Sequence, residues 1–148
     1  MANGTWSFLD VTATLTGPTG IIDMGYGAAT AKEGITISMA QDRDSLTVGA
    51  DGEYMHSLRA DKSGTAVVRC LYNSDLNSKL QAMYEAQSLS SSLWGQNSIT
   101  VRNKGNQDIV VCRGVAFTRQ PDKVFAEDGA TVEWSFSCGK IDNLMGTY

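Results

Sequence analysis

Apolar and polar residues alternate along much of the chain, and this pattern predicts β-strands. In residues 33–40 the apolar side chains of Ile35 and Ile37 stand at every second position, with polar residues between them. Residues 131–138 alternate in the same way, and a period of two is typical of a strand with one buried face. Residues 64–72 are rich in β-branched and apolar side chains, as strands are. Further strands are expected at residues 9–16, 21–24, 98–102 and 108–120.

The period changes after residue 72 and then matches an amphipathic helix over residues 74–87. Asn73 or Ser74 can cap its first turn through a side-chain oxygen. One stripe of the helix collects most of its apolar side chains, namely Leu76, Leu80, Met83 and Tyr84, and Gln87 continues it. The narrow stripe predicts that the helix packs against a sheet.

Two glycines mark irregular positions in the predicted strands. Gly105 lies in a hairpin turn at residues 103–106, where a positive φ is expected. Gly114 lies inside the strand at residues 108–120 and indicates a β-bulge there.

A long segment, about residues 42–60, separates the strands at 33–40 and 64–72. Segments of this length inside a domain are usually functional or disordered, and apolar residues among the charged ones argue against simple disorder. We expect an arm that packs on another subunit; the alternative is a loop that folds back on its own domain. The residues expected to make this contact are Asp42, Arg43, Asp44, Leu46, Val48, Tyr54, Met55 and His56.

Together these elements predict a mainly β protein with six or seven strands. The expected architecture is an antiparallel two-sheet sandwich or barrel with one flanking helix and the long inter-strand loop. The length of 148 residues fits one domain, residues 1–148.

Composition and charge argue against several classes of function. The net charge of −4 argues against a surface that wraps a phosphate backbone. No apolar run approaches the roughly 18 residues of a membrane span, and the first residues lack a signal-peptide pattern, so synthesis in the cytoplasm is expected. The three cysteines, Cys70, Cys112 and Cys138, are far apart and odd in number, and this favours buried core thiols over a disulfide or zinc site.

No pattern for catalysis or cofactor binding is found. His56 is the only histidine, so a zinc site with two histidines is excluded and any His-dependent triad must use this one residue. Residues 42–53 resemble a calcium loop, but Leu46 replaces an oxygen ligand and Thr47 replaces the turn glycine. Residues 25–30 lack the third glycine of a dinucleotide fingerprint. We therefore expect no enzyme activity, no cofactor and no metal.

The order of short motifs resembles that of bacteriophage tail tube proteins. These motifs span nearly the whole chain in one register, and their order carries the resemblance more than any single motif. They are residues 6–11 (WSFLDV), 32–37 (KEGITI), 47–52 (TVGADG), 55–58 (MHSL), 62–65 (KSGT), 95–101 (GQNSITV) and 139–142 (GKID).

This resemblance implies a fold shared with the tube protein of type VI secretion, and assembly into six-membered rings that stack as the hollow inner tube of a phage tail. The implied partners are copies of the chain itself, the tail sheath, the baseplate or tail tip, and the tail terminator. The tape-measure protein and DNA would occupy the lumen transiently, and the subunit itself would bind no membrane. The protein would be assembled in the host bacterial cytoplasm and end in the virion tail.

A channel for DNA should be polar with little positive charge, because each lysine or arginine adds attraction for phosphate. From alternation alone, the residues expected to face the lumen are Thr36, Ser38, Glu133, Ser135 and Ser137. The alternative is that these side chains simply meet bulk solvent. Which face of residues 64–72 looks inward stays open, because Arg69 shares a face with Val67.

Two other functions compete with a phage tail tube. The chain could form the inner tube of a contractile bacteriocin or secretion particle, which carries no DNA. From a different class, it could be a carbohydrate-binding or adhesion β-sandwich in which Trp6, Trp94 and Trp134 stack on sugars, although Trp134 lies on the apolar face of its strand.

Overall fold

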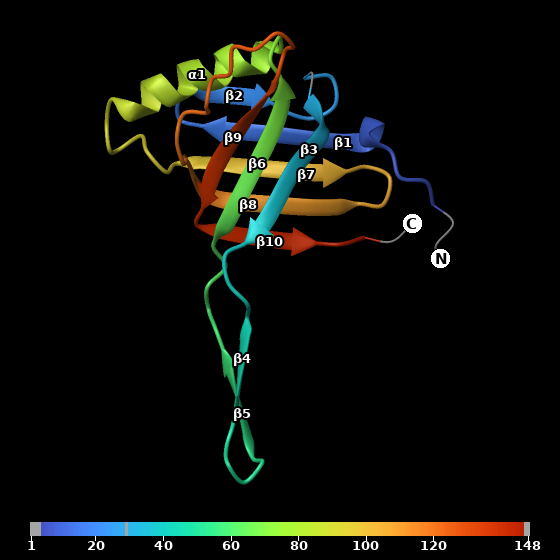
Figure 1. Cartoon of the computed structure of the whole chain (residues 1–148), viewed down its shortest axis with the longest axis vertical. Coiled ribbons are helices and arrows are strands. Elements are labelled where there is room, and N and C mark those ends of the chain that lie inside the picture. The colour runs from blue at the N-terminus through green and yellow to red at the C-terminus, as the bar shows by residue number, and fades with distance from the viewer. Residues whose placement is uncertain (1–3, 29, 147–148) are drawn as a thin grey trace.

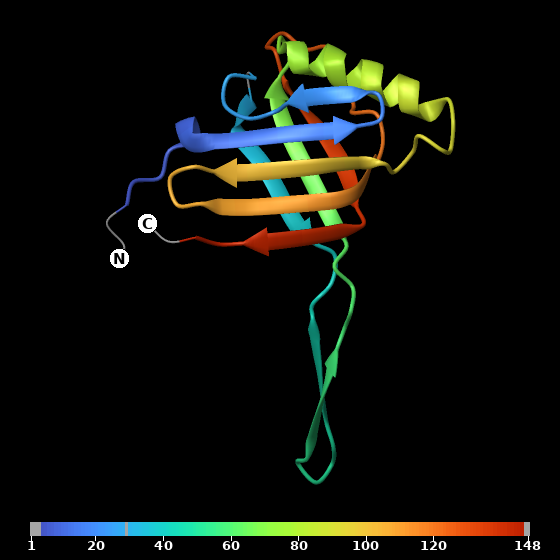
Figure 2. The same cartoon turned by 180° about the vertical axis from the view of Figure 1, so that it is seen from behind.

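The strands form two layers that cross each other and a hairpin that projects from one end (Figures 1 and 2). A computed structural model describes residues 4–28 and 30–146. The first layer contains β1 (Val11–Gly17), β2 (Gly20–Asp23), β7 (Asn97–Asn103), β8 (Asp108–Phe117) and β10 (Lys140–Leu144). The second layer contains β3 (Thr30–Met39), β6 (Gly64–Leu71) and β9 (Thr131–Cys138). The projecting hairpin is β4 (Asp44–Val48) and β5 (Tyr54–Leu58), and the one α-helix of the described chain is α1 (Asp75–Ser88).

Strand β8 joins the two layers. All pairings are antiparallel, and the strand order is β2-β1-β7-β8-β9-β6-β3, with β10 also paired to β8. The last two residues of β8, Ala116 and Phe117, pair with β9, whereas its earlier residues pair with β7 and β10. At Gly114, which has φ 62°, the register with β7 shifts, so the predicted bulge is confirmed. The bulge bends β8 from one layer toward the other.

The sheet does not close on itself, because β2 and β3 stand at its two ends. The single subunit therefore does not form the barrel that was one of the two predicted alternatives. The other alternative, an antiparallel arrangement in two layers, is confirmed. Two layers crossing at an angle need a strand that switches between them through a bend, and β8 provides it.

The core lies between the layers and under the helix. In β9 the alternation predicted from the sequence is confirmed, since Val132, Trp134, Phe136 and Cys138 are buried. Phe117 packs against Trp134 and Phe136, with ring centroids 6.0 and 4.9 Å apart. Buried aromatic side chains remove large apolar areas from water, so this cluster is a main source of stability. The three cysteines are free and buried in β6, β8 and β9, as predicted.

Helix α1 matches its prediction within one residue. The Ser74 hydroxyl accepts a hydrogen bond from the Leu76 N–H at 3.1 Å and caps the first turn. The helix lies beside β2 and covers one end of the first layer (Figures 1 and 2). Its buried residues are Leu76, Leu80, Met83 and Gln87. The Gln87 side chain is satisfied by a reciprocal amide pair with Asn97, with N–O distances of 2.7 and 2.8 Å.

The described residues form ten strands, whereas six or seven were predicted. Two of the additional strands, β4 and β5, lie in the expected loop at residues 42–60, and β10 lies in the tail that showed no period. In β10 only Ile141 is buried and the strand is five residues long, so its sequence shows no run of alternating apolar side chains.

Two predicted strand boundaries and one predicted turn conformation were wrong for local reasons. The strand expected from residue 9 begins at Val11, because residues Phe8–Asp10 form a 3-10 turn that leaves Leu9 63% exposed. The strand expected to reach residue 120 ends at Phe117, where its pairing with β9 ends. The positive φ in the β7–β8 turn falls at Gln107 (65°) and not at Gly105, because the Gln107 N–H closes the turn onto the Asn103 carbonyl.

Candidate assembly surfaces

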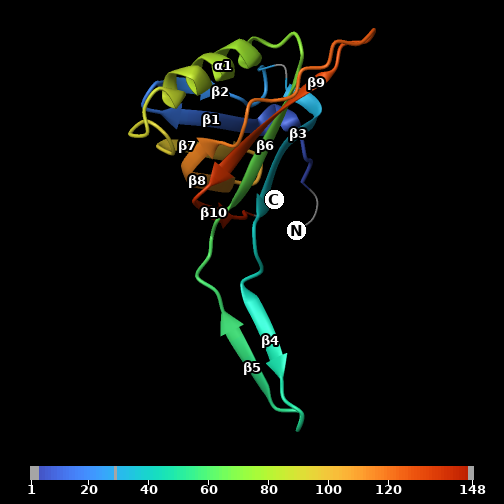
Figure 3. The ribbon, with the colours of Figure 1, turned by 60° about the vertical axis from the view of Figure 1, so that its left-hand side comes forward.

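The β4–β5 hairpin extends away from both layers instead of folding back on them (Figures 1 and 3). The two strands pair from Asp44↔Leu58 to Val48↔Tyr54, so the hairpin is regular over its full length. Its tip is closed by a hydrogen bond from the Gly49 N–H to the Glu53 carbonyl at 2.6 Å. Gly52 has φ 85°, a conformation that glycine adopts without strain.

One face of this hairpin is largely apolar and open to solvent. Residues directly opposite each other in an antiparallel pair share a face, and side chains alternate along each strand. The pairing therefore places six residues on one face, namely Asp44, Leu46, Val48, Tyr54, His56 and Leu58. Their four apolar or aromatic side chains are between 55% and 82% exposed. Single exposed apolar residues are common, but four on one face of a two-stranded ribbon form an exposed apolar patch, a feature that is typical of interaction sites.

The other predicted arm residues are arranged differently. Met55 is 60% exposed but lies on the opposite face, across from Thr47. Asp42 and Arg43 precede β4, and the Arg43 carbonyl accepts a hydrogen bond from the Arg59 N–H at 2.8 Å. Asp44 and His56 lie together, with 3.1 Å between the His56 Nδ1 and the carboxylate oxygens. The polar partner of His56 is thus the exposed Asp44 carboxylate. The contacts that the structure shows for His56 include no serine or cysteine that it could activate as a nucleophile.

The root of the hairpin is fastened to β10, a contact that was not predicted. The Ile141 N–H donates to the Lys62 carbonyl at 2.9 Å. The Asp142 carboxylate lies 3.3 Å from the Lys62 ammonium and 3.5 Å from an Arg113 nitrogen. Lys62 and Asp142 fall in two of the quoted motifs, 62–65 and 139–142, but 80 residues separate them, and nothing in a single sequence pairs them.

The five residues predicted to face the lumen lie on one surface. In the registers of the second layer Thr36 lies opposite Val67, which lies opposite Ser135, and Ser38, Thr65 and Ser137 form the next row. Glu133 lies opposite Arg69 in the row beyond. The intervening residues of β6 and β9 are buried, so this set occupies the outer face of the layer. We call it the hydroxyl face: Thr36, Ser38, Thr65, Val67, Arg69, Glu133, Ser135 and Ser137.

The second layer has an open edge on each side. Within the described residues β3 pairs only with β6. On the far side β9 pairs with β8 only at Phe136 and Ser137, and the Thr118 N–H adds a hydrogen bond of 3.0 Å to the Ser135 carbonyl. Unpaired edges offer backbone N–H and C=O groups to another chain.

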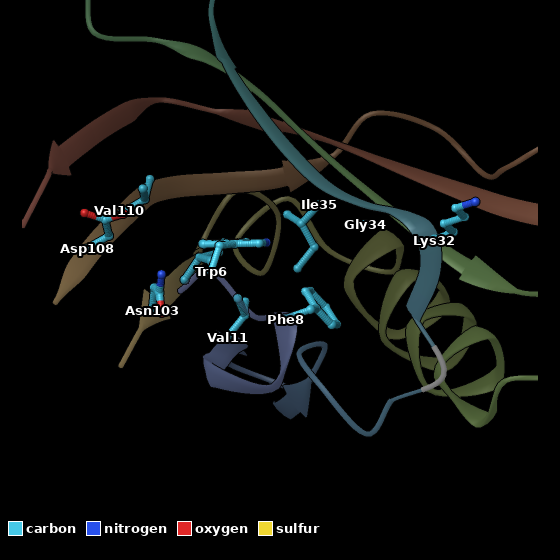
Figure 4. Close-up of a pocket in the computed structure, with 10 residues that line it drawn as sticks. Trp6, Phe8, Val11, Lys32, Gly34, Ile35, Asn103, Asp108 and Val110 are labelled. Atoms are coloured by element: carbon cyan, nitrogen blue, oxygen red, sulfur yellow. The ribbon is translucent and has the colours of Figure 1, made fainter. Parts of the chain in front are cut away.

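An apolar pocket of about 510 Å³ lies between the layers near the N-terminal segment. Trp6, Phe8 and Ile35 point into it from the N-terminal segment and β3 (Figure 4). Its other lining residues are Val11, Lys32, Gly34, Val101, Asn103, Asp108 and Val110. This pocket was not predicted, since its walls come from four distant segments.

The described residues show no arrangement for catalysis or metal binding. They contain no group of three His, Cys, Asp or Glu side chains able to hold a metal ion. Burial raises the pKa of the Cys70 thiol to about 11, so this thiol is protonated and unreactive at neutral pH. Trp134 is buried, so the three tryptophans cannot line one exposed sugar-binding surface. Across the same part of the chain, no helix has both the length and the apolar character needed to cross a membrane.

Several solved structures with this fold come from contractile injection systems. The chain resembles one in the PVC sheath–tube complex of an extracellular contractile injection system, with a TM-score of 0.62, 9% identity and coverage of 97% of this chain and 94% of that one. A chain in the baseplate of the anti-feeding prophage gives a TM-score of 0.62 with 10% identity, covering 97% of each. A chain in the PVC sheath/tube terminator gives 0.59 with 10% identity, covering 97% and 99%. At these identities the likeness shows a common fold.

Sequence comparison identifies the family. No curated protein matches the chain. The family model of the bacteriophage PhiTE tail tube protein matches residues 3–146, nearly the whole chain. The predicted resemblance to phage tail tube proteins is thereby confirmed, and the chain belongs to the PhiTE tail tube protein family.

Proposed function

We propose that this chain, as one tube domain per subunit, assembles into hexameric rings that stack as the inner tube of a phage tail and form the conduit for DNA. The family match over residues 3–146 carries this proposal. As a tail tube protein the chain is part of the tail, and we infer that it is made and assembled in the host cytoplasm. Its role is structural, and we infer no catalytic activity.

The open edges of the second layer suit ring closure. β3, β6, β9 and the end of β8 follow one another in antiparallel pairs, so β3 and β8 run in opposite directions. A contact between β3 of one subunit and the end of β8 in the next would therefore extend the sheet antiparallel. Such a head-to-tail contact closes when its rotation completes a ring, and closure removes the exposed edges.

The β4–β5 hairpin suits contact with a neighbouring subunit or ring. Its apolar face, Leu46, Val48, Tyr54 and Leu58, is exposed to solvent and is bordered by Asp44 and His56, whose ring packs edge-on against Tyr54. An apolar centre with a polar rim is the usual composition of a protein interface. Stacking of rings through such arms is open-ended and produces a tube.

Further partners follow from this role. The related folds occur in a sheath–tube complex, a baseplate and a sheath/tube terminator. We infer that this tube likewise contacts a sheath, a baseplate or tail tip, and a terminator. The tape-measure protein and then DNA would occupy its lumen, which we assign to the hydroxyl face. The inner tube of a DNA-free injection particle is a second candidate, because one structural relative belongs to an extracellular contractile injection system.

Two observations test this function. Electron microscopy of the purified untagged protein, beside its light-scattering mass, should show rings or hollow tubes of uniform width. A protein that stays monomeric at high concentration, and also on purified tail-tip complexes, would contradict the proposal. Capsid and packaging genes beside the gene support the phage tail, and their absence supports the injection particle.

A further inference from the structure

The hydroxyl face carries almost no charge. Most of its eight residues are threonine or serine, with Val67 as the apolar member. Among these paired positions Arg69 is the one cation and Glu133 the one anion, and the two lie directly opposite each other on β6 and β9. Opposite charges at directly opposed positions attract across an antiparallel pair.

Arg69 is held from both neighbouring strands. Its Nη1 donates a hydrogen bond of 2.9 Å to the Thr36 hydroxyl on β3. Its Nε lies 3.9 Å from a carboxylate oxygen of Glu133 on β9. The Arg69 side chain is 24% exposed, whereas that of Glu133 is 58% exposed. The Arg69 side chain is therefore largely covered, and the Glu133 side chain beside it is the more accessible of the two.

An uncovered arginine at this position would bind nucleic acid. The planar guanidinium pairs with phosphate through two parallel hydrogen bonds and is always charged. Each such contact adds affinity that depends on salt and not on sequence. In a ring of identical subunits the contact would repeat around the channel and again in every ring, and multivalent contacts reinforce one another.

We infer that Glu133 and Thr36 mask Arg69, so that the hydroxyl face offers no phosphate contact to double-stranded DNA. This rests on the proposed function, because it takes the hydroxyl face as the channel wall. Arg69 links the three strands of the layer, while its masking keeps the wall from retaining the DNA that passes. Glu133 and Thr36 act as positioning residues: they contact the arginine and not the DNA.

The test measures binding of a short DNA duplex of random sequence to full-length protein below its assembly concentration. Glu133→Gln should raise the affinity about tenfold at low salt, the effect of one charge-assisted contact. The double variant Thr36→Val/Glu133→Gln should bind more tightly still, and its salt dependence should steepen by about one phosphate contact. Adding Arg69→Gln to the double variant should return binding to the wild-type level.

Glu53→Gln is the matched control, because it removes the same charge from the exposed hairpin tip. Equal gains for Glu53→Gln and Glu133→Gln would mean that net charge alone matters, and would overturn the inference. A gain that survives Arg69→Gln would also overturn it. Tube formation by every variant is recorded by microscopy, so that failure of this inference can be told apart from failure of the proposed function. Normal tubes without a gain in DNA binding would refute the masking of Arg69 alone.

Discussion

Asn77 connects the helix α1 to the strands β6 and β9 through a single side-chain amide. Its Oδ1 accepts from the Trp134 indole N–H and from the Cys70 thiol, each at 3.1 Å. Its Nδ2 donates to the carbonyls of Leu71 and Tyr72 at 3.0 and 3.1 Å. Burial of Trp134 was predictable from alternation, but the partner of its indole was not, because Asn77 lies 57 residues away on an element of different period.

Replacing Asn77 with leucine should lower the free energy of unfolding by about 2–3 kcal/mol, because the buried indole N–H loses its acceptor. Chemical denaturation at a concentration below assembly measures this loss. Ser78→Ala is the control: Ser78 is exposed and bonds only the Asp75 carbonyl, so a change under about 0.5 kcal/mol is expected. Equal stability of Asn77→Leu and wild type would contradict the role of the amide.

The cysteines should react slowly in the folded protein. The thiolate is the reactive form, and burial raises the pKa of Cys70 to about 11, so this group stays protonated at pH 8. Cys112 and Cys138 are also buried. A chromogenic thiol reagent should label three thiols per chain in denaturant but almost none under native conditions. Rapid native labelling of any cysteine would contradict the burial described for it.

At the scale of elements, a helix or strand could be predicted from the sequence where one of its faces packs against the core. The strands β6 and β9 and the helix α1 each bury one face, and β3 partly buries Ile35 and Ile37, so the periods of these elements are visible in the sequence. The hairpin buries nothing within its own subunit. Its signal is short: Leu46 and Val48 alternate with Ser45 and Thr47 before the turn at residues 49–52, between charged residues. The packing partners across the fold depend on register, which a single sequence does not specify.

Leu46→Asp should abolish assembly and leave the unfolding midpoint of the subunit unchanged, since Leu46 is exposed and the hairpin stands clear of the core (Figure 3). Sedimentation measures assembly, and thermal denaturation measures stability. Thr47→Asp is the matched control, because it adds the same charge to the same strand on the opposite face. If both variants assembled like the wild type, the apolar face would not be an interface, and if both failed alike, the effect would not be specific to that face.

At the scale of the whole molecule, three features point toward assembly. The second layer has an unpaired edge at β3 and a partly paired edge at β9, the hairpin extends beyond the domain, and the hydroxyl face is polar and nearly neutral. The proposed ring, its stacking and its channel would be formed by contacts between subunits. Neither the sequence nor one folded chain therefore specifies how the subunits are placed relative to one another. Five of the eight residues of the hydroxyl face were predicted from the alternation of two strands, whereas its three residues on β6, Arg69 among them, were left unassigned because both faces of β6 carry apolar residues.

The most direct test of the tube is a cryo-EM reconstruction of the assembled protein with its symmetry determined from the images. Six subunits per ring are predicted, with β3 of one subunit beside the end of β8 in the next, the hydroxyl face toward the lumen and the hairpin on a neighbouring subunit or ring. A tube whose lumen is lined by the first layer, or whose hairpins stand free in solvent, would contradict this account.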